Sequence, residues 1–149
     1  MKVILQTQPF DPGFLLTAFG ARHPEAGAVA SFSGYVRAEG GDTGSLELEA
    51  YPGLTDVEIG RFGGTAGERF GLIDWLVVHR IGLIPAGEAI VFVATASRHR
   101  REAFEACDYL MDYLKSRAPF WKKSHGPHGA RWIEPTDRDR TDLERWETP

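Results

Sequence analysis

Two apolar segments, joined by a turn that contains proline and glycine, constrain the fold of this chain more than any other feature. Residues 73–81 include a tryptophan and two adjacent valines, and residues 88–96 read Glu-Ala-Ile-Val-Phe-Val-Ala-Thr-Ala. Runs of β-branched and aromatic residues of this length are typical of strands, and residues 84–87 (Ile-Pro-Ala-Gly) fit a type I turn. The sequence therefore predicts a β-hairpin over residues 73–96, and its apolar run indicates burial on both faces.

The longest predicted helix follows this hairpin directly, over about residues 98–117, with Ser97 as its N-cap. Apolar residues that recur at helical intervals mark its buried face, with Cys107 among them as a packed thiol: Phe104, Cys107, Leu110 or Met111, and Leu114. The helix opens with three arginines and a histidine (residues 98–101), although cations at a helix N-terminus oppose the macrodipole. Such a locally unfavourable placement indicates that an anion binds there.

Shorter elements are predicted on both sides of this central unit. Strands are expected at residues 2–6, 27–36, 45–51, 120–123 and 131–133. One helix opens with Asp11 as N-cap and Pro12 as its first residue, and another runs from Thr55 to Phe70 behind a Thr55-x-x-Glu58 capping box. The remaining segments are expected to be a glycine-rich mobile loop at 38–44, a loop at 125–129, and a charged tail at 135–149 that forms a partial helix anchored by Trp146.

Composition places the chain among single-domain proteins of the cytoplasm. Its 149 residues fit one domain, of which 135–149 form the charged tail, and the 42% hydrophobic and 26% charged content is ordinary for a globular protein. No apolar run approaches the ~20 residues that span a bilayer, and the N-terminus lacks the features of a signal peptide. A single cysteine excludes an internal disulfide, which suits a reducing compartment. We therefore expect no membrane partner.

A cationic stretch stands out against a net charge of −4. From Tyr113 to Ile133 there is no Asp or Glu, while four cations fall within residues 113–124: Lys115, Arg117, Lys122 and Lys123. Cations concentrated against the global balance indicate a local anion site. Phe120 and Trp121 could form an apolar wall that desolvates a lysine and lowers its pKa. The alternative is a solvated, frayed helix end, where cations are also common.

Other chemistries find little support in the sequence. A zinc site from His99, His125 and His128 is disfavoured because His99 is flanked by arginines and there is no second cysteine. No Gly-x-Ser-x-Gly elbow indicates a serine hydrolase, and the glycines of residues 60–67 lack the Gly-Lys-Ser/Thr ending of a P-loop. Nucleic acid is not expected as a partner, because the cations are too few.

A pocket that binds an anionic small molecule remains the best interpretation of the sequence. Arg37, where a strand meets a flexible loop, and the helix start at 98–101 are the binding candidates. Lys115, in the last turn of the helix, and Lys122, beyond a proline break, are the candidate acid-base groups. Two nearby ammonium groups depress each other's pKa, which favours proton transfer near neutral pH.

The chain resembles the large, catalytic subunit of molybdopterin synthase, the MoaE family. Five stretches carry the resemblance: residues 27–37 (Gly-Ala-Val-Ala-Ser-Phe-Ser-Gly-Tyr-Val-Arg), 46–55 (Leu-Glu-Leu-Glu-Ala-Tyr-Pro-Gly-Leu-Thr), 78–82 (Val-His-Arg-Ile-Gly), 97–106 (Ser-Arg-His-Arg-Arg-Glu-Ala-Phe-Glu-Ala), and 111–123 (Met-Asp-Tyr-Leu-Lys-Ser-Arg-Ala-Pro-Phe-Trp-Lys-Lys), followed by Arg131-Trp132. They run over most of the chain in the expected order, and the Leu-Lys-x-Arg-Ala-Pro-Phe-Trp-Lys core is highly specific.

The resemblance implies a fold, an activity and partners. The fold would be a hammerhead-like α+β domain with a mixed or antiparallel sheet and a long helix in its C-terminal half. Two large subunits would form a dimer within a heterotetramer, with a small ubiquitin-like (MoaD-like) sulfur carrier at each end. The carrier's Gly-Gly C-terminus, as a thiocarboxylate, would donate sulfur twice to cyclic pyranopterin monophosphate and give the dithiolene of molybdopterin. The family uses no metal and no cofactor for this step.

The same resemblance assigns roles to individual residues. Lys115 and Lys122 would line the reacting centre, and Arg37, His99 and Arg100 would bind the substrate, with the His-Arg pair coming from the neighbouring subunit. Three more residues are expected around the partner tail: Phe120, Trp121 and Lys123. Ser124 departs from the family, which usually has Glu there, so the role of that carboxylate must be dispensable or filled elsewhere. The rival hypothesis is a non-catalytic module that docks a ubiquitin-like tail.

Overall fold

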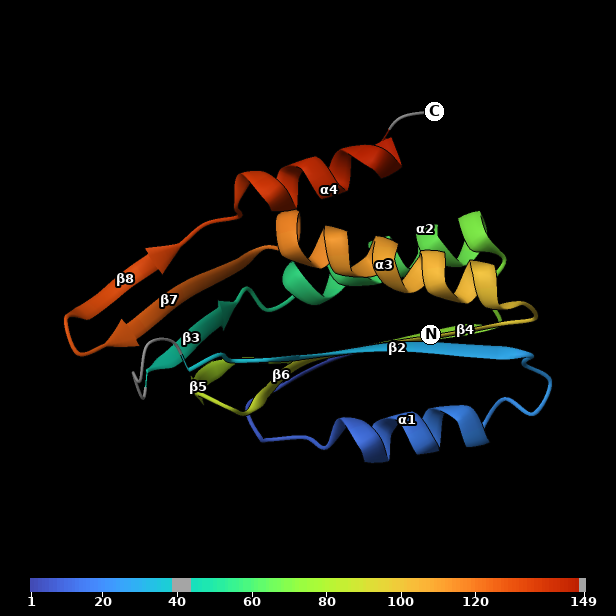
Figure 1. The fold of residues 1–149 in the computed structure, drawn as a ribbon, viewed down its shortest axis with the longest axis horizontal. Helices are drawn as coiled ribbons and strands as arrows, with labels where there is room; N and C mark the ends of the chain where they lie inside the picture. The colour runs from blue at the N-terminus through green and yellow to red at the C-terminus, as the bar shows by residue number, and fades with distance from the viewer. Residues whose placement is uncertain (39–43, 148–149) are drawn as a thin grey trace.

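Two four-stranded sheets organise the chain in the computed structural model, which describes residues 1–38 and 44–147 (Figure 1). The first sheet has the order β1 (Lys2–Gln6), β4 (Asp74–Arg80), β6 (Ala89–Ser97) and β2 (Ala28–Tyr35). The second has the order β5 (Gly82–Pro85), β3 (Ser45–Ala50), β7 (Phe120–Gly126) and β8 (Gly129–Ile133). Among the described strands, only β1 and β4 pair in parallel, so the expected mixed sheet is confirmed. Most of the predicted loop at 38–44 lies outside the described residues.

In the described part of the chain, four helices complete the α+β fold: α1 (Pro12–Ala21), α2 (Thr55–Phe70), α3 (Arg100–Ser116) and α4 (Asp137–Glu147). Figure 1 shows α1 on one face of the first sheet and α2 with α3 on the other. The predicted long helix in the C-terminal half is α3. Across the described part of the chain, no helix is both long and apolar enough to cross a membrane.

The predicted hairpin forms the centre of the first sheet. β4 and β6 pair antiparallel, with Val77 opposite Val93. Alternate side chains point to opposite faces of a strand. Val77 and Val93 accordingly pack in the cluster beneath α2 and α3, whereas Val78 and Phe92 pack with Phe19 of α1. Burial on both faces is therefore confirmed, and it explains why these strands carry no alternation of polar residues.

The connection inside this hairpin is longer than the sequence indicated. A separate strand, β5, occupies residues 82–85 and pairs with β3 of the second sheet. The turn that follows β5 comes one residue later than predicted, where the N–H of Glu88 donates to the carbonyl of Pro85 at 3.3 Å. Of the four residues of β5, Ile84 alone is fully buried. Because this short segment also contains a glycine and a proline, it has no alternating apolar pattern from which a strand could be predicted. The central hairpin thereby joins the two sheets.

The long helix differs from its prediction at two residues. Its N-cap is His99, not Ser97, whose hydroxyl instead contacts the backbone of His99. Cys107 is buried as predicted, but Phe104 is 65% exposed. The small residue Ala103 occupies the buried stripe that we assigned to Phe104, and an alanine is easily overlooked in a hydrophobic pattern.

α2 begins at Thr55 as predicted, but the capping box is wrong. Leu54 is the N-cap and makes no side-chain cap bond. The Thr55 hydroxyl instead accepts the N–H of Tyr51 and donates to the carbonyl of Pro119, both at 2.8 Å. This buried hydroxyl ties the start of α2 to the start of β7. The glycine-containing helix packs on the core through Ile59.

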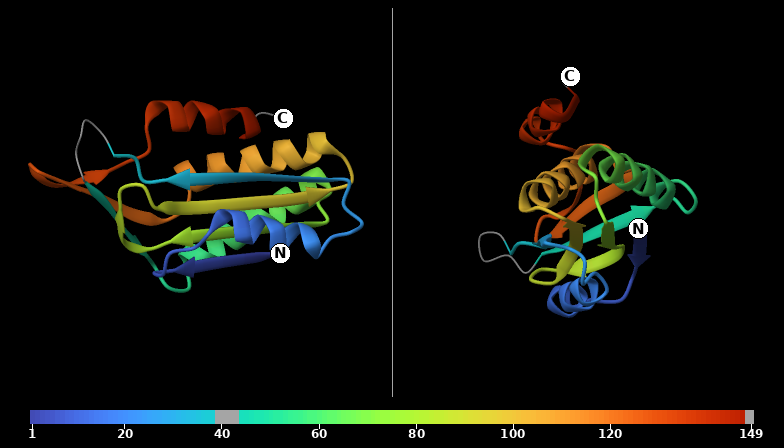
Figure 2. Two further views of the ribbon diagram at one scale, coloured as in Figure 1. Left: turned by 60° about the horizontal axis from the view of Figure 1, so that its bottom comes forward. Right: turned by 90° about the vertical axis from the view of Figure 1, so that its right-hand side faces the viewer.

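The C-terminal third is more regular than the sequence indicated. The loop predicted at 125–129 is wrong: β7 continues to Gly126, and β8 begins at Gly129, which faces it across the turn. β7 is polar and has little apolar pattern, and its pairing with β3 on one side and β8 on the other stabilises it as a strand. The expected tail helix is confirmed as α4, which packs on α3 (Figure 2), and its Trp146 donates from Nε1 to Asp112 at 2.5 Å.

Candidate active site

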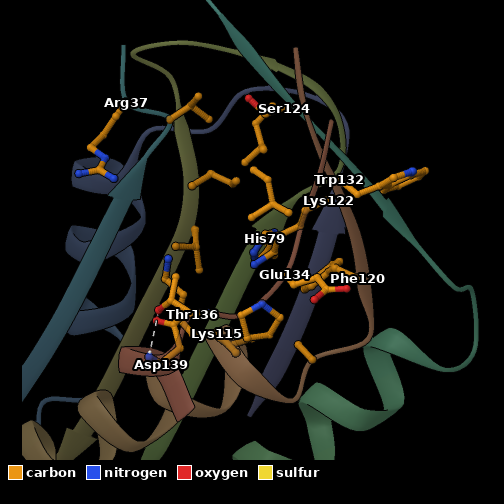
Figure 3. A pocket seen from close by; sticks show the side chains of 18 of the residues that line it. Arg37, His79, Lys115, Phe120, Lys122, Ser124, Trp132, Glu134, Thr136 and Asp139 are labelled. Carbon is orange, nitrogen blue, oxygen red and sulfur yellow. Dashed lines mark hydrogen bonds between the residues drawn. The ribbon is translucent and has the colours of Figure 1, made fainter. Parts of the chain in front are cut away.

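A cavity of about 910 Å³ lies at the C-terminal end of α3, between residues of both sheets (Figure 3). Eight strands and helices contribute to its wall, together with the segment that leads into α4. The sequence-predicted residues Arg37, Lys115, Lys122 and Phe120 all line it. Segments far apart in the sequence therefore bring the two lysines and one of the arginines into one pocket.

The two lysines reach the cavity from different elements. Lys115 lies in the last turn of α3, and Lys122 lies on β7 after the chain has turned at Pro119. Because side chains alternate along a strand, Phe120, Lys122 and Ser124 share the face of β7 that lines the cavity. Burial, with the Lys115 ammonium as a second cause, lowers the pKa of Lys122 to about 8. Lys122 can therefore take up or release a proton near neutral pH.

His79 is a cavity residue that the sequence reasoning missed. It lies on β4 and is only 5% exposed, and its ring stacks on Phe120 with 4.4 Å between centroids. Its Nδ1 lies 2.9 Å from the carbonyl of Arg80, which can only accept, so Nδ1 carries the proton and Nε2 is an acceptor. Burial lowers the pKa of His79 to about 4, which keeps the ring neutral at pH 7. The signal in the sequence that could have identified His79 was a single histidine within an otherwise apolar predicted strand.

The neutral buried ring of His79 predicts a loss of stability in acid. Its pKa is about 4 in the folded chain against 6.5 for a free group, so between these pH values only the unfolded state binds the proton. The free energy of unfolding should fall as the pH drops from 6.5 to 4, by up to about 3 kcal/mol. His79→Asn, whose amide can still donate to the Arg80 carbonyl, should reduce this fall.

Urea unfolding at pH 7 and pH 4.5 measures this difference. His128→Asn, in the exposed β7–β8 turn, is the matched control and should keep the acid sensitivity of the parent. Equal pH dependence in the parent and His79→Asn would contradict the assignment.

His99 and Arg100 do not line this cavity. They lie at the N-terminal end of α3, and Lys115 lies at its C-terminal end, about 22 Å away along the helix. Arg37 lies two residues beyond β2 and lines the cavity from that strand. Within one chain, the structure therefore brings Arg37 to the lysines and leaves the His-Arg pair at the far end of the same helix.

The residues expected around a partner tail divide between two faces of β7. Phe120 lines the main cavity, whereas Trp121 and Lys123 line a separate pocket of about 50 Å³ with Trp132. The rings of Trp121 and Trp132 meet edge to face at 5.4 Å, and the Lys123 ammonium lies 5.1 Å from the Trp132 ring centroid. The outer face of the second sheet thus carries an exposed aromatic surface with a cation on it.

Carboxylates reach the cavity from the C-terminal segment. Ser124 lines the wall without a charge, while Glu134 and Asp139 both line it. The sequence reasoning missed Asp139 within the mixed-charge tail; the Thr136-x-x-Asp139 pattern, a capping box before a helix, was the available signal. Within the described residues, no three His, Cys, Asp or Glu side chains gather as a metal site would require.

Comparisons with known proteins agree with one another. A family model described as "MoaE protein" matches residues 5–117. The molybdopterin synthase catalytic subunit of Caulobacter vibrioides is 65% identical over 147 residues, covering 99% of this chain and 98% of its own. A molybdopterin biosynthesis MoaE protein from Burkholderia ambifaria has a TM-score of 0.85 at 40% identity, with 99% of each chain covered. Molybdopterin synthase from Staphylococcus aureus has a TM-score of 0.78 at 30% identity, covering 89% of this chain and 98% of its own.

Proposed function

The chain belongs to the MoaE family, and we propose that it is the catalytic subunit of a molybdopterin synthase, the name that its relatives carry. In this role it transfers sulfur from the thiocarboxylated Gly-Gly C-terminus of a small ubiquitin-like subunit. The acceptor is cyclic pyranopterin monophosphate, which takes up two sulfurs and becomes the dithiolene molybdopterin. The single cysteine supports the proposal that this step of molybdenum cofactor biosynthesis takes place in the reducing cytoplasm.

The lysine pair in the cavity is the observation that carries this proposal. Lys115 and Lys122 line one pocket together with Arg37, and both reactants, a phosphate ester and a thiocarboxylate, are anions. Cations in a partly desolvated pocket attract such groups more strongly than they would in water. The volume of about 910 Å³ is large enough for a pterin and the end of an extended peptide.

The two lysines are proposed to have different roles. Lys122, with a pKa of about 8, gives a proton to the oxygen that leaves the pterin side chain as the thiocarboxylate sulfur forms a bond to the same carbon. Water then cleaves the acyl–sulfur bond, so the sulfur stays on the pterin and the carrier leaves as a carboxylate. Lys115 stabilises the negative charge that develops in this step, as a fixed ammonium group does in an oxyanion site. The neutral His79 ring lies against Phe120 and adds no competing positive charge at pH 7.

The carrier's tail is proposed to enter along β7. Phe120 lines the cavity and would contact the tail itself. Trp121 and Lys123 face the opposite side of the sheet, with Trp132, and would contact the folded body of the carrier. Exposed aromatic residues of this kind are common at protein interfaces.

A homodimer is proposed to complete the substrate site. β2 is an edge strand of the first sheet, and exposed apolar side chains lie on it and on the neighbouring α3: Val29, Phe32 and Phe104. β2 and α3 both run between the cavity and the end that carries His99 and Arg100. A two-fold axis across this face would set the two copies antiparallel, so each His-Arg pair would approach the partner's cavity. This arrangement would supply anions for the cationic start of α3.

The function is tested by reconstitution with purified components. The chain is mixed with a thiocarboxylated carrier and cyclic pyranopterin monophosphate, and dithiolene formation is followed. A carrier with an ordinary C-terminal carboxylate is the matched control and should give no product. Co-elution with the thiocarboxylated carrier but no dithiolene would overturn the enzymatic proposal and indicate a docking module.

A further inference from the structure

α4 is fixed firmly to the rest of the chain at its C-terminal end. Asp112 of α3 accepts hydrogen bonds from Trp146 Nε1 at 2.5 Å and from Arg145 Nη2 at 2.7 Å. Arg69 of α2 donates to the carbonyl of Trp146 at 2.9 Å, and the side chain of Leu143 is 3% exposed. These contacts fix the direction of the helix, so the position of its first turn is also fixed.

The first turn of α4 carries a carboxylate into the cavity wall. Thr136 and Asp139 form a reciprocal capping box: the N–H of Thr136 donates to Asp139 Oδ2 at 2.9 Å, and the N–H of Asp139 donates to the Thr136 hydroxyl at 3.1 Å. Figure 3 shows this pair beside Lys115. The box uses Oδ2 of Asp139, and Oδ1 takes no part in it. The orientation of this side chain is thus set by the backbone of its own helix.

Asp139 lines the same cavity as Lys122, the lysine that is proposed to exchange a proton. Besides Lys122, the charged or titratable groups that line the cavity are Tyr35, Arg37, His79, Lys115, His125, Arg131, Glu134 and Asp139. Burial and the Lys115 ammonium lower the pKa of Lys122, and the Asp139 carboxylate opposes them and raises it. Glu134 lines the same wall but is not among the causes that shift Lys122. The carboxylate from α4 therefore shifts the pKa of Lys122 in the opposite direction to the cation from α3.

We propose that Asp139 is a positioning residue of the lysine pair, the counter-charge through which α4 keeps Lys122 an ammonium group beside Lys115 at neutral pH. Its effect on turnover rests on the proposed function, whereas its effect on the charge of Lys122 is a property of the chain alone. The serine at position 124 contributes no charge on this face of β7, so the carboxylate comes from a different element.

The test compares Asp139→Asn with Asp137→Asn in the full-length chain. Asparagine at 139 can still accept the N–H of Thr136, so the capping box is kept while the charge is lost. Asp137 is in the same turn, pairs with Arg140 and is fully exposed, which makes it a matched control for charge and helix position. The pH dependence of Lys122 labelling by an amine-reactive reagent is read by mass spectrometry, with the exposed Lys2 as internal reference.

In the parent, the labelling midpoint of Lys122 is expected near pH 8. Asp139→Asn should lower it by about one pH unit, which raises labelling at pH 7 about fivefold, and Asp137→Asn should leave it unchanged. Asp139→Glu keeps both the charge and the cap and should restore the parent midpoint. Equal midpoints for Asp139→Asn and Asp137→Asn would overturn the proposal. Circular dichroism checks folding, and Asp139→Ser replaces Asp139→Asn if that variant does not fold.

A second readout separates this inference from the proposed function. In the reconstituted reaction, one inflection of the pH–rate profile should report the pKa of Lys122. This inflection should move to lower pH by the same interval in Asp139→Asn and should not move in Asp137→Asn. A parent chain without turnover would refute the proposed function and leave the labelling comparison valid. Normal turnover with an unmoved profile and unmoved labelling would refute the role of Asp139 alone.

Discussion

Replacing Lys122 with methionine is expected to reduce sulfur transfer at least about 100-fold while making the fold more stable. Methionine fills a similar volume but cannot carry a proton. The pKa of Lys122 falls from 10.5 to about 8 on folding, so the folded chain holds this ammonium at a cost. At pH 7 the variant should gain on the order of 1–3 kcal/mol in the free energy of unfolding. Initial rates of dithiolene formation and urea unfolding measure the two effects.

The pH dependence of this gain has a definite sign. Between pH 8 and 10.5 the unfolded state binds more protons at Lys122 than the folded state does, so the stability of the parent rises with pH in this window. The stability difference between Lys122→Met and the parent should therefore shrink from pH 8 to pH 10. Lys2→Met, on the exposed first strand, is the control and should show neither effect. A variant with full turnover, or a gap that does not depend on pH, would contradict the assignment.

Lys115→Ala tests the other half of the pair. If Lys115 stabilises developing charge, this variant should also lose turnover by about two orders of magnitude. It removes a cation that depresses the pKa of Lys122, so the labelling midpoint of Lys122 should rise. Parent-level turnover by Lys115→Ala would reject the role of this residue.

Gly63→Ala is expected to destabilise the fold by about 2–4 kcal/mol, although alanine is the better helix former. A Cβ at position 63 would lie 2.2 Å from Cζ2 and 2.3 Å from Cη2 of Trp75, a side chain that is only 4% exposed. The indole ring cannot withdraw without disturbing the core beneath α2. The helix therefore contains a glycine at this position because the tryptophan occupies the space of a side chain.

Gly64→Ala is the matched control in the same helix. No atom lies within 4 Å of a Cβ built at position 64, so the helix propensity of alanine should stabilise the fold by up to about 1 kcal/mol. Urea unfolding of the two variants beside the parent measures effects of opposite sign. Equal stabilities for the two variants would show that packing against Trp75 does not control position 63.

The sequence predicted those elements whose own apolar pattern is long and continuous. The central hairpin and the long helix are long and strongly apolar, and both are confirmed. Phe104 was misassigned because a hydrophobic pattern does not distinguish a side chain that faces the core from one that faces solvent on the same helix. β5 and the second half of β7 were missed because they are stabilised as strands by pairing with β3, which is distant in the sequence.

The candidate site was predictable to a similar extent. Lys115 and Lys122 lie only seven residues apart, and a proline between them indicated a turn, so the sequence could bring them together. His79 is 36 residues from Lys115, and Asp139 is in a segment whose composition indicates only a solvated helix. Their place beside the lysines depends on the pairing of β4 with β6 and on the docking of α4, which no local pattern contains.

The order of the strands has a consequence for how the chain matures during synthesis. Every strand of the first sheet, together with α1, α2 and α3, precedes residue 117, whereas β7, β8 and α4 follow it. During synthesis the N-terminal part of a chain leaves the ribosome first. The first sheet can therefore close around its core while Lys122 is still inside the exit tunnel, and β3 waits with an unpaired edge until β7 emerges. We expect the reactive pocket to form after the first sheet, so a nascent chain is inert until β7 has emerged and paired with β3.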